Sequence, residues 1–186
     1  IQIALLSEDL RGRVYDQING QLLHQSKVLT ENFSKKILHY ISAKIEEKTY
    51  VPGECVFDVS DLDFSVYFIS KGDIELYFPK GQNPAIKLGK GANFGEVAFF
   101  TGMARNKRAM SVGFSSLLNL KRDNFTEILK DFPVDRESFC SIKDKISIYQ
   151  NHSSLDLKCI VCRSPAHIVE MCPKIRYVPD KALIIK

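Results

Sequence analysis

The sequence predicts an α+β fold. N-terminal helices precede an antiparallel, jelly-roll-like β-roll with one short helix, and a long C-terminal helix and a small cysteine-rich tail follow. Three observations predict this order. Apolar residues recur at helical spacing before residue 48 and after residue 133. Short apolar runs separated by glycine turns fill the middle of the chain. Three of the five cysteines lie within the last thirty residues.

Length and composition indicate one folded core. The 186 residues are 45% hydrophobic and 26% charged, which is typical of a globular protein. The net charge of +4 is scattered, so bulk attraction to nucleic acid or lipid is weak. No apolar run is long enough to cross a bilayer, and we interpret the short apolar start at Ile1 as the cut end of a longer protein. An odd number of cysteines favours a reducing, cytosolic setting over a secreted disulfide framework.

Residues 1–48 are expected to form short amphipathic helices. Ser7 and Thr30 are the expected N-caps of two of them. Apolar residues follow each cap at spacings of three or four, namely Leu10, Val14 and Ile18 after the first and Phe33, Ile37, Ile41 and Ile45 after the second. These helices precede the β-roll.

Residues 49–132 are expected to form the roll, because the periodicity changes at Val51-Pro52-Gly53-Glu54. Strands are predicted over residues 55–59, 66–70, 74–78, 85–88, 109–114 and 117–120, with short helices over 96–100 and 122–130. Pro133 then opens a helix predicted to run to residue 158, on which Ile142, Ile146 and Tyr149 share one face.

The segment from Gly91 to Phe100, together with an arginine further along, has the chemistry of a sugar-phosphate site. Gly95 lets backbone N–H groups approach an anion, and the helix expected after it directs its positive N-terminus toward that anion. An arginine can bind a phosphate, and Glu96 can accept a hydrogen bond from a ribose hydroxyl. One base and one acid would thus hold two parts of one ligand.

Three motifs in order resemble the cyclic-nucleotide-binding domain family. Val51-Pro52-Gly53-Glu54 resembles the turn that opens the family's roll, and residues 66–74, VYFISKGDI, resemble a signature of its strands. The third motif resembles the phosphate-binding cassette and joins Phe94, Gly95, Glu96, Val97 and Ala98 to Arg108-Ala109-Met110-Ser111-Val112. The resemblance implies a regulatory domain that binds cAMP or cGMP through these residues.

The sequence leaves open which arginine binds the phosphate. Many family members place it nine residues after the glutamate, at Arg105 here, but the downstream strand aligns on Arg108 and implies a loop three residues longer. We favour Arg108. Family members that respond to cGMP usually have threonine after this arginine, and this chain has Ala109, which favours cAMP. The alternative is that Glu96 and Arg108 form an internal ion pair in a domain that binds no nucleotide.

The flanking helices also resemble those of one branch of the family. Residues 1–48 are similar to the later C-linker of cyclic-nucleotide-gated and hyperpolarisation-activated cation channels, potassium channels among them, although other such domains carry an N-terminal helical cap. The resemblance implies a pore domain in the same full-length chain, a cytoplasmic location and tetramers formed through these helices. It also implies that residues 133–158 are a lid that closes over the purine and gates the channel, with Ile142 and Ile146 facing the ligand. Plain core packing is the alternative for these isoleucines.

Residues 159–186 contain the pattern C-x2-C-x4-H-x4-C, formed by Cys159, Cys162, His167 and Cys172. Three thiolates and an imidazole match tetrahedral zinc. The alternative is three unrelated thiols and a histidine. The pattern resembles retroviral zinc knuckles, but it has Ile160 where these carry an aromatic residue that stacks on bases. We therefore expect a structural or regulatory zinc site and no nucleic-acid partner.

We do not expect an enzyme. The sequence offers no nucleophile, base and orienting group together, and four protein ligands leave zinc no open position. A kinase-regulatory type of cyclic nucleotide sensor is a rival interpretation, but it would show a pseudosubstrate and usually a second tandem domain, and this sequence shows neither. A protein that binds nucleic acid through the knuckle is another.

Overall fold

The computed structural model describes residues 20, 22–79, 81, 83–155, 157, 159, 161–164, 168, 169 and 172–174. The helix predicted after Ser7 and the predicted zinc ligand His167 lie outside this range. None of the helices in the described residues combines the length and the apolar composition that a membrane span requires.

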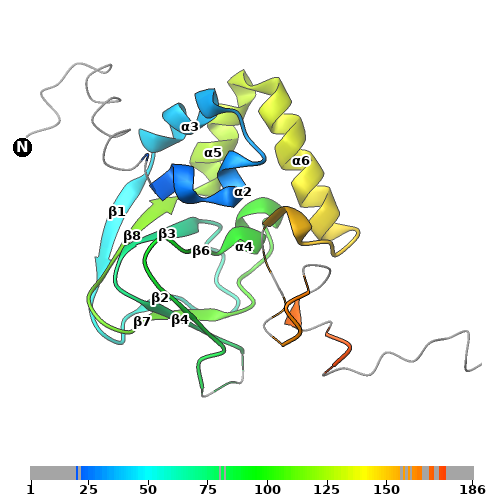
Figure 1. Ribbon diagram of the computed structural model, residues 1–186. Helices are drawn as coiled ribbons and strands as arrows, with labels where there is room; N and C mark the ends of the chain where they lie inside the picture. Colours follow the sequence, from blue (N-terminus) through cyan, green and yellow to red (C-terminus); the bar gives the residue numbers. More distant parts are fainter. Residues whose placement is uncertain are drawn as a thin grey trace, which may run out of the picture.

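Two antiparallel four-stranded sheets form the predicted β-roll (Figure 1). The first sheet has the order β1 (Glu46–Tyr50), β8 (Ser115–Leu120), β3 (Val66–Lys71) and β6 (Asn93–Phe94). The second has the order β2 (Cys55–Phe57), β7 (Arg108–Ser111), β4 (Ile74–Tyr77) and β5 (Ile86–Leu88). All of these pairings are antiparallel, so the fold class predicted from the sequence is confirmed.

The central strand β3 separates two apolar cores. Successive side chains of a strand point to opposite faces. Val66 and Phe68 therefore pack with the helices, whereas Tyr67 and Ile69 pack inside the roll. This explains why residues 66–69 form an unbroken apolar run rather than an alternating one.

The helices gather on one side of the roll (Figure 1). They are α2 (Lys27–Thr30), α3 (Lys35–Ser42), α4 (Glu96–Thr101), α5 (Arg122–Ile128) and α6 (Pro133–Ser147), with short 3-10 turns at Leu129–Asp131 and at Ser153–Leu155, the latter called η3. Phenylalanine rings join them. Phe139 of α6 packs 5.4 Å from Phe100 of α4 and 5.7 Å from Phe125 of α5, measured between ring centroids. Helices α4, α5 and α6 thus meet in one aromatic cluster.

The structure differs from the sequence prediction at three element boundaries. The helix predicted to run to residue 158 ends at Ser147, because Gln150 adopts a left-handed conformation and the Asn151 N–H bonds back to the Lys145 carbonyl. Ser34, not Thr30, caps α3, and its Oγ accepts from the Ile37 N–H. Strand β1 begins at Glu46, inside the range 1–48 predicted to be helical, because it pairs along its whole length with β8.

Candidate functional site

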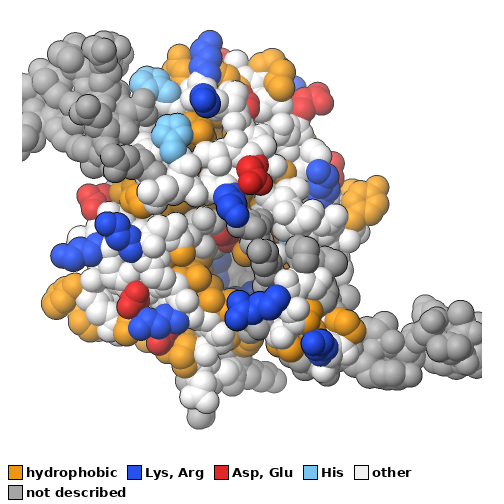
Figure 2. All heavy atoms as spheres, in the orientation of Figure 1, with side chains coloured by type: hydrophobic (Ala, Val, Ile, Leu, Met, Phe, Trp, Pro, Cys, Tyr) orange, Lys and Arg blue, Asp and Glu red, His pale blue; other side chains and the backbone are white. Residues whose placement is uncertain are grey.

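A half-open cleft of about 140 Å³ lies between the start of α4 and strands β4 and β5. Most of its lining is apolar and includes Phe57, Leu76, Ile86, Leu88, Val97 and Leu157. Its polar side chains include Glu96, Arg105, Asn106 and Lys107. Figure 2 shows lysine and arginine side chains around a hollow near the middle of one face. An apolar cleft with a few charged groups at one end suits a ligand with a flat base and an anionic group.

Gly95 lies between β6 and α4, where it is the N-cap of α4, and it has a left-handed conformation with φ of 91°. A Cβ atom at this position would lie 2.6 Å from Nη1 of Arg105 and 2.9 Å from the Ser65 carbonyl oxygen. Glycine is therefore required both by the backbone conformation and by the close approach of Arg105. The turn brings Phe94, Gly95, Glu96, Val97 and Ala98, the residues of the predicted cassette, together at the cleft wall.

Glu96 is the first residue of α4 and is only 4% exposed. The side-chain amide of Asn93 donates a hydrogen bond to its Oε1. Burial raises the pKa of Glu96, and the hydrogen bond from Asn93 and the positive charge of Arg105 oppose this rise only in part. A buried carboxyl group on the cleft wall can exchange hydrogen bonds with a ligand hydroxyl.

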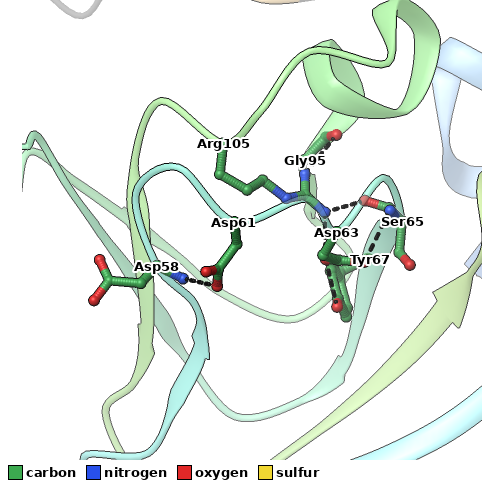
Figure 3. Close-up of polar contacts among 7 residues, drawn as sticks. All are labelled: Asp58, Asp61, Asp63, Ser65, Tyr67, Gly95 and Arg105. Carbon is green, nitrogen blue, oxygen red and sulfur yellow. Dashed lines mark hydrogen bonds and ion pairs between the residues drawn. The ribbon is translucent and has the colours of Figure 1, made fainter.

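Arg105 lies across the cleft floor and is 4% exposed (Figure 3). Its Nη1 donates to the Gly95 carbonyl at 2.9 Å, and its Nη2 donates to Asp63 Oδ2 at 2.6 Å and to the Ser65 carbonyl at 2.5 Å. The guanidinium carbon lies 4.0 Å from the centroid of the Phe57 ring. Among the residues that the structure describes, the buried Nε has no hydrogen-bond partner. Because this atom is also shielded from solvent, a ligand reaches the donor only after the side chain shifts.

Backbone hydrogen bonds hold Arg105 in this place. Its N–H donates to the Asp61 carbonyl at 3.0 Å, and its own carbonyl accepts from the Ser60 N–H at 2.8 Å. The loop that carries Arg105 is thus paired with the loop that carries Asp63. The sequence analysis did not identify Asp63, because a single acid in an irregular loop has no periodicity or motif to mark it.

Asp63 anchors the arginine from below the cleft. Partial burial opposes its ionisation, but hydrogen bonds from Arg105, Ser65 and Tyr67 outweigh burial and lower its pKa. Asp63 is therefore ionised at neutral pH and holds the charged guanidinium in position.

Arg108 is the first residue of strand β7 and lies outside the cleft. Its side chain is 48% exposed and forms a two-pronged ion pair with Asp58, with Nη2–Oδ2 at 2.6 Å and Nε–Oδ1 at 3.0 Å. Arg108 does not line the cleft, and the internal Glu96–Arg108 pair considered above is not formed. The geometry favours Arg105, the reverse of our preference from the sequence. Arg105 stands nine residues after Glu96 and precedes β7, which begins at Arg108.

Ala109 is fully buried inside the roll, where it pairs with Phe57 of β2 and Leu76 of β4. It lies in the core and not among the residues that line the cleft. The residue after the cleft arginine is Asn106, which does line it. The position that would distinguish the two cyclic nucleotides therefore moves from Ala109 to Asn106.

Ile142 and Ile146 of α6 are buried among the helices and do not line the cleft. Their position matches the alternative of core packing. The residue after α6 that does line the cleft is Leu157, which the sequence analysis did not single out. It follows η3, and no periodic pattern continues that far.

The tail brings three predicted zinc ligands together. The Sγ atoms of Cys159, Cys162 and Cys172 all lie within 4.8 Å of one another. Cys159 and Cys172 are buried. Burial raises the pKa of Cys159, but hydrogen bonds from the backbone of Cys162 and Val161 and from the neighbouring thiols outweigh it and lower the pKa to about 6. Three clustered thiols with backbone donors are suited to a soft divalent metal such as zinc. His167 remains a ligand predicted from the sequence alone.

Part of this chain is similar in sequence to known proteins. Residues 47–132 match the cyclic nucleotide-binding domain family. Residues 47–132 form a cyclic nucleotide-binding domain. The chain is 27% identical over 134 residues to cyclic nucleotide-gated channel alpha-4 of Mus musculus. This alignment covers 69% of the chain and 23% of the relative. The chain is also 28% identical over 134 residues to potassium/sodium hyperpolarization-activated cyclic nucleotide-gated channel 4 of Homo sapiens. This second alignment covers 72% of the chain and 11% of the relative. The cyclic nucleotide-binding domain is thus homologous to domains of these channels, and the chain spans less than a quarter of their length.

Proposed function

We propose that this chain is a regulatory domain that binds a cyclic nucleotide in the cleft between α4 and strands β4 and β5. One observation carries the proposal. The buried guanidinium of Arg105, whose Nε has no hydrogen-bond partner among the described residues, lines the cleft together with the buried Glu96. In this arrangement Arg105 binds the cyclic phosphate and Glu96 exchanges a hydrogen bond with the ribose 2′-hydroxyl. The family match over residues 47–132 supports the same ligand class.

The apolar walls would hold the purine. Leu76, Ile86 and Leu88 from β4 and β5 face Val97 of α4 and Leu157 across the cleft lining. A base between such walls gains apolar contact without needing a specific hydrogen bond. We propose cAMP as the preferred nucleotide, because Asn106 follows Arg105 and carries no hydroxyl in the place where a threonine favours cGMP.

We further propose that the domain regulates a cation channel, as the names of its relatives state for those proteins. The full-length chain would then carry a pore domain, lie with this part in the cytoplasm and assemble as a tetramer through residues 1–48. The transmission route is short. Glu96 begins α4, and Phe99 and Phe100 of the same helix pack on Phe139 of α6. A ligand that binds at the start of α4 would therefore change the balance between the open and closed positions of α6.

A kinase-regulatory sensor would use the same cleft, and its expected output would be release of a kinase rather than channel opening. The homology to channels favours the channel setting. Binding of nucleic acid by the tail is not favoured, because the residue after Cys159 is Ile160 rather than an aromatic residue.

The test is a calorimetric titration of the 186-residue chain with cAMP, cGMP and 5′-AMP. We expect cAMP to bind at one site and cGMP to bind more weakly. We expect 5′-AMP, which has the same base and sugar but an open, dianionic phosphate, to bind at least about tenfold more weakly than cAMP. Undetectable binding of both cyclic nucleotides would contradict the proposal and leave a homologous domain that does not bind them.

A further inference from the structure

We propose that Cys159, Cys162 and Cys172 bind a divalent metal ion of the zinc type, and that this metal site fixes Leu157 in the wall of the cleft. Metal and cyclic nucleotide would then bind cooperatively. The coupling rests on the proposed function, whereas the metal site does not.

The backbone around the first two cysteines is already shaped for a metal. The Cys159 N–H donates to the Ser164 carbonyl at 2.9 Å, and the Arg163 N–H donates to the Cys159 carbonyl at 2.8 Å. Arg163 turns the chain through a left-handed conformation with φ of 62°. This turn directs two sulfur atoms, three residues apart in sequence, toward the sulfur of Cys172. A tight C-x2-C pair followed by more distant ligands is the usual construction of small zinc sites, which bind the ion with four ligands, and Cys172 is one of the distant ones.

The three cysteines form no disulfide bond, although their sulfur atoms lie within 4.8 Å of one another. Backbone N–H groups of Val161 and Cys162 face the Cys159 sulfur, and the N–H of Lys174 faces that of Cys172. Donors of this kind orient and stabilise thiolate ligands of metals. The chain's other two cysteines, Cys55 and Cys140, are exposed and lie outside the cluster.

Leu157 connects the metal site to the cleft. Two residues before it, Leu155 is buried in the helical core, and two residues after it, Cys159 is buried in the thiol cluster. Leu157 itself lines the cleft and packs against the helical core. On the helical side, Asn32 also donates to the Ser154 carbonyl at 3.2 Å. The segment is thus held at both ends, and the thiol cluster is the anchor that depends on a metal.

A wall residue that is fixed before the ligand arrives costs less to order when the ligand binds. A bound metal therefore raises nucleotide affinity by stabilising the position of Leu157. By thermodynamic reciprocity, the nucleotide raises metal affinity by the same factor. We expect a factor on the order of ten, which corresponds to ordering one side chain and a short piece of backbone.

The metal site is tested first, without nucleotide. The chelator-treated chain is titrated with cobalt(II) and then zinc(II), and thiolate-to-cobalt absorption and bound zinc by native mass spectrometry are followed. We expect one metal ion per chain, loss of that binding in Cys159→Ser and Cys172→Ser, and unchanged binding in Cys55→Ser and Cys140→Ser. Absence of thiolate absorption, or equal loss in the control variants, would overturn the metal site.

The coupling is tested by titrating cAMP into the zinc-loaded and the metal-free chain. We expect affinity to fall about tenfold without zinc. Leu157→Ala should bind zinc normally but lose the zinc dependence of cAMP affinity, whereas Val161→Ala, at an exposed position of the same turn, should keep it. Equal cAMP affinity with and without zinc, or tighter binding without it, would overturn the coupling. Failure of the zinc-loaded chain to bind any cyclic nucleotide would overturn the proposed function and the coupling together, and the metal titration would still stand.

Discussion

Arg105 and Arg108 are three residues apart in sequence and occupy opposite environments. Arg105 is buried on the cleft floor with hydrogen bonds to Gly95, Ser65 and Asp63. Arg108 is half exposed on the outer side of β7, in an ion pair with Asp58. Both have carboxylate partners, but only Arg105 has a buried donor left over. An ion pair alone therefore does not distinguish the two arginines, whereas burial in the cleft lining with an unsatisfied donor makes Arg105 the candidate for phosphate binding.

The difference predicts unequal losses of affinity. Replacing Arg105 by alanine removes a charge-assisted hydrogen bond to the phosphate in a desolvated site. The expected loss is about 3 kcal/mol, or roughly a hundredfold in cAMP affinity. Arg108→Ala should change affinity by less than about twofold, because exposed ion pairs contribute little. Calorimetric titration of both variants checks this.

Arg105→Lys keeps the charge but loses the guanidinium fork, so it should also lose most of the affinity if the Nε donor matters. Thermal unfolding of the three variants shows whether each is folded. A large loss in Arg108→Ala with little loss in Arg105→Ala would restore the sequence-based assignment.

Glu96→Gln should weaken cAMP binding by roughly tenfold, because a neutral amide is a weaker partner for the ribose hydroxyl than a carboxylate. The same variant should unfold at a higher temperature near neutral pH. Burial raises the pKa of Glu96, so its stability contribution is present at low pH and is lost as pH rises through the raised pKa. Glutamine removes that dependence. A variant that loses stability at pH 7 would contradict this account.

Asp63→Asn should act mainly on stability. The isosteric amide leaves the buried Arg105 without its counter-ion, although the Ser65 and Gly95 carbonyls remain, and the expected cost is about 1–2 kcal/mol. Because the pKa of Asp63 is lowered, its contribution is present above its unfolded pKa and is lost as pH falls through the folded pKa. The difference between wild type and variant in chemical denaturation should therefore shrink in acid. An equal difference at all pH values would contradict it.

The smallest expected effect concerns ligand choice. Asn106→Thr places a hydroxyl after the cleft arginine and should raise cGMP affinity relative to cAMP by about two- to fivefold. Ala109→Thr is the matched comparison. It should leave selectivity unchanged and reduce stability, because Ala109 is fully buried in the roll. Competition between the two nucleotides in one titration measures both.

The fold and the cassette could be predicted from sequence because their signals are local. Glycine turns mark the ends of the strands. The positions of Gly95 and Glu96 are set by one tight turn, and a short sequence motif is enough to identify that turn. The choice of Arg105 over Arg108 could not be predicted, because the downstream strand aligns on Arg108 and the pairing of Arg105 with Ser60 and Asp61 is a contact between distant segments. Leu157 escaped prediction for a similar reason, since it lies beyond the point where Gln150 turns the chain.

A structure of the chain with cAMP bound, determined by crystallography, tests the central claim most directly. We expect the cyclic phosphate within hydrogen-bond distance of Nε of Arg105, the ribose 2′-hydroxyl at the Glu96 carboxyl and the purine against Val97 and Leu157, with the Arg108–Asp58 ion pair unchanged. A phosphate bound to Arg108 on the outer side of β7, or a nucleotide outside the cleft, would contradict the account.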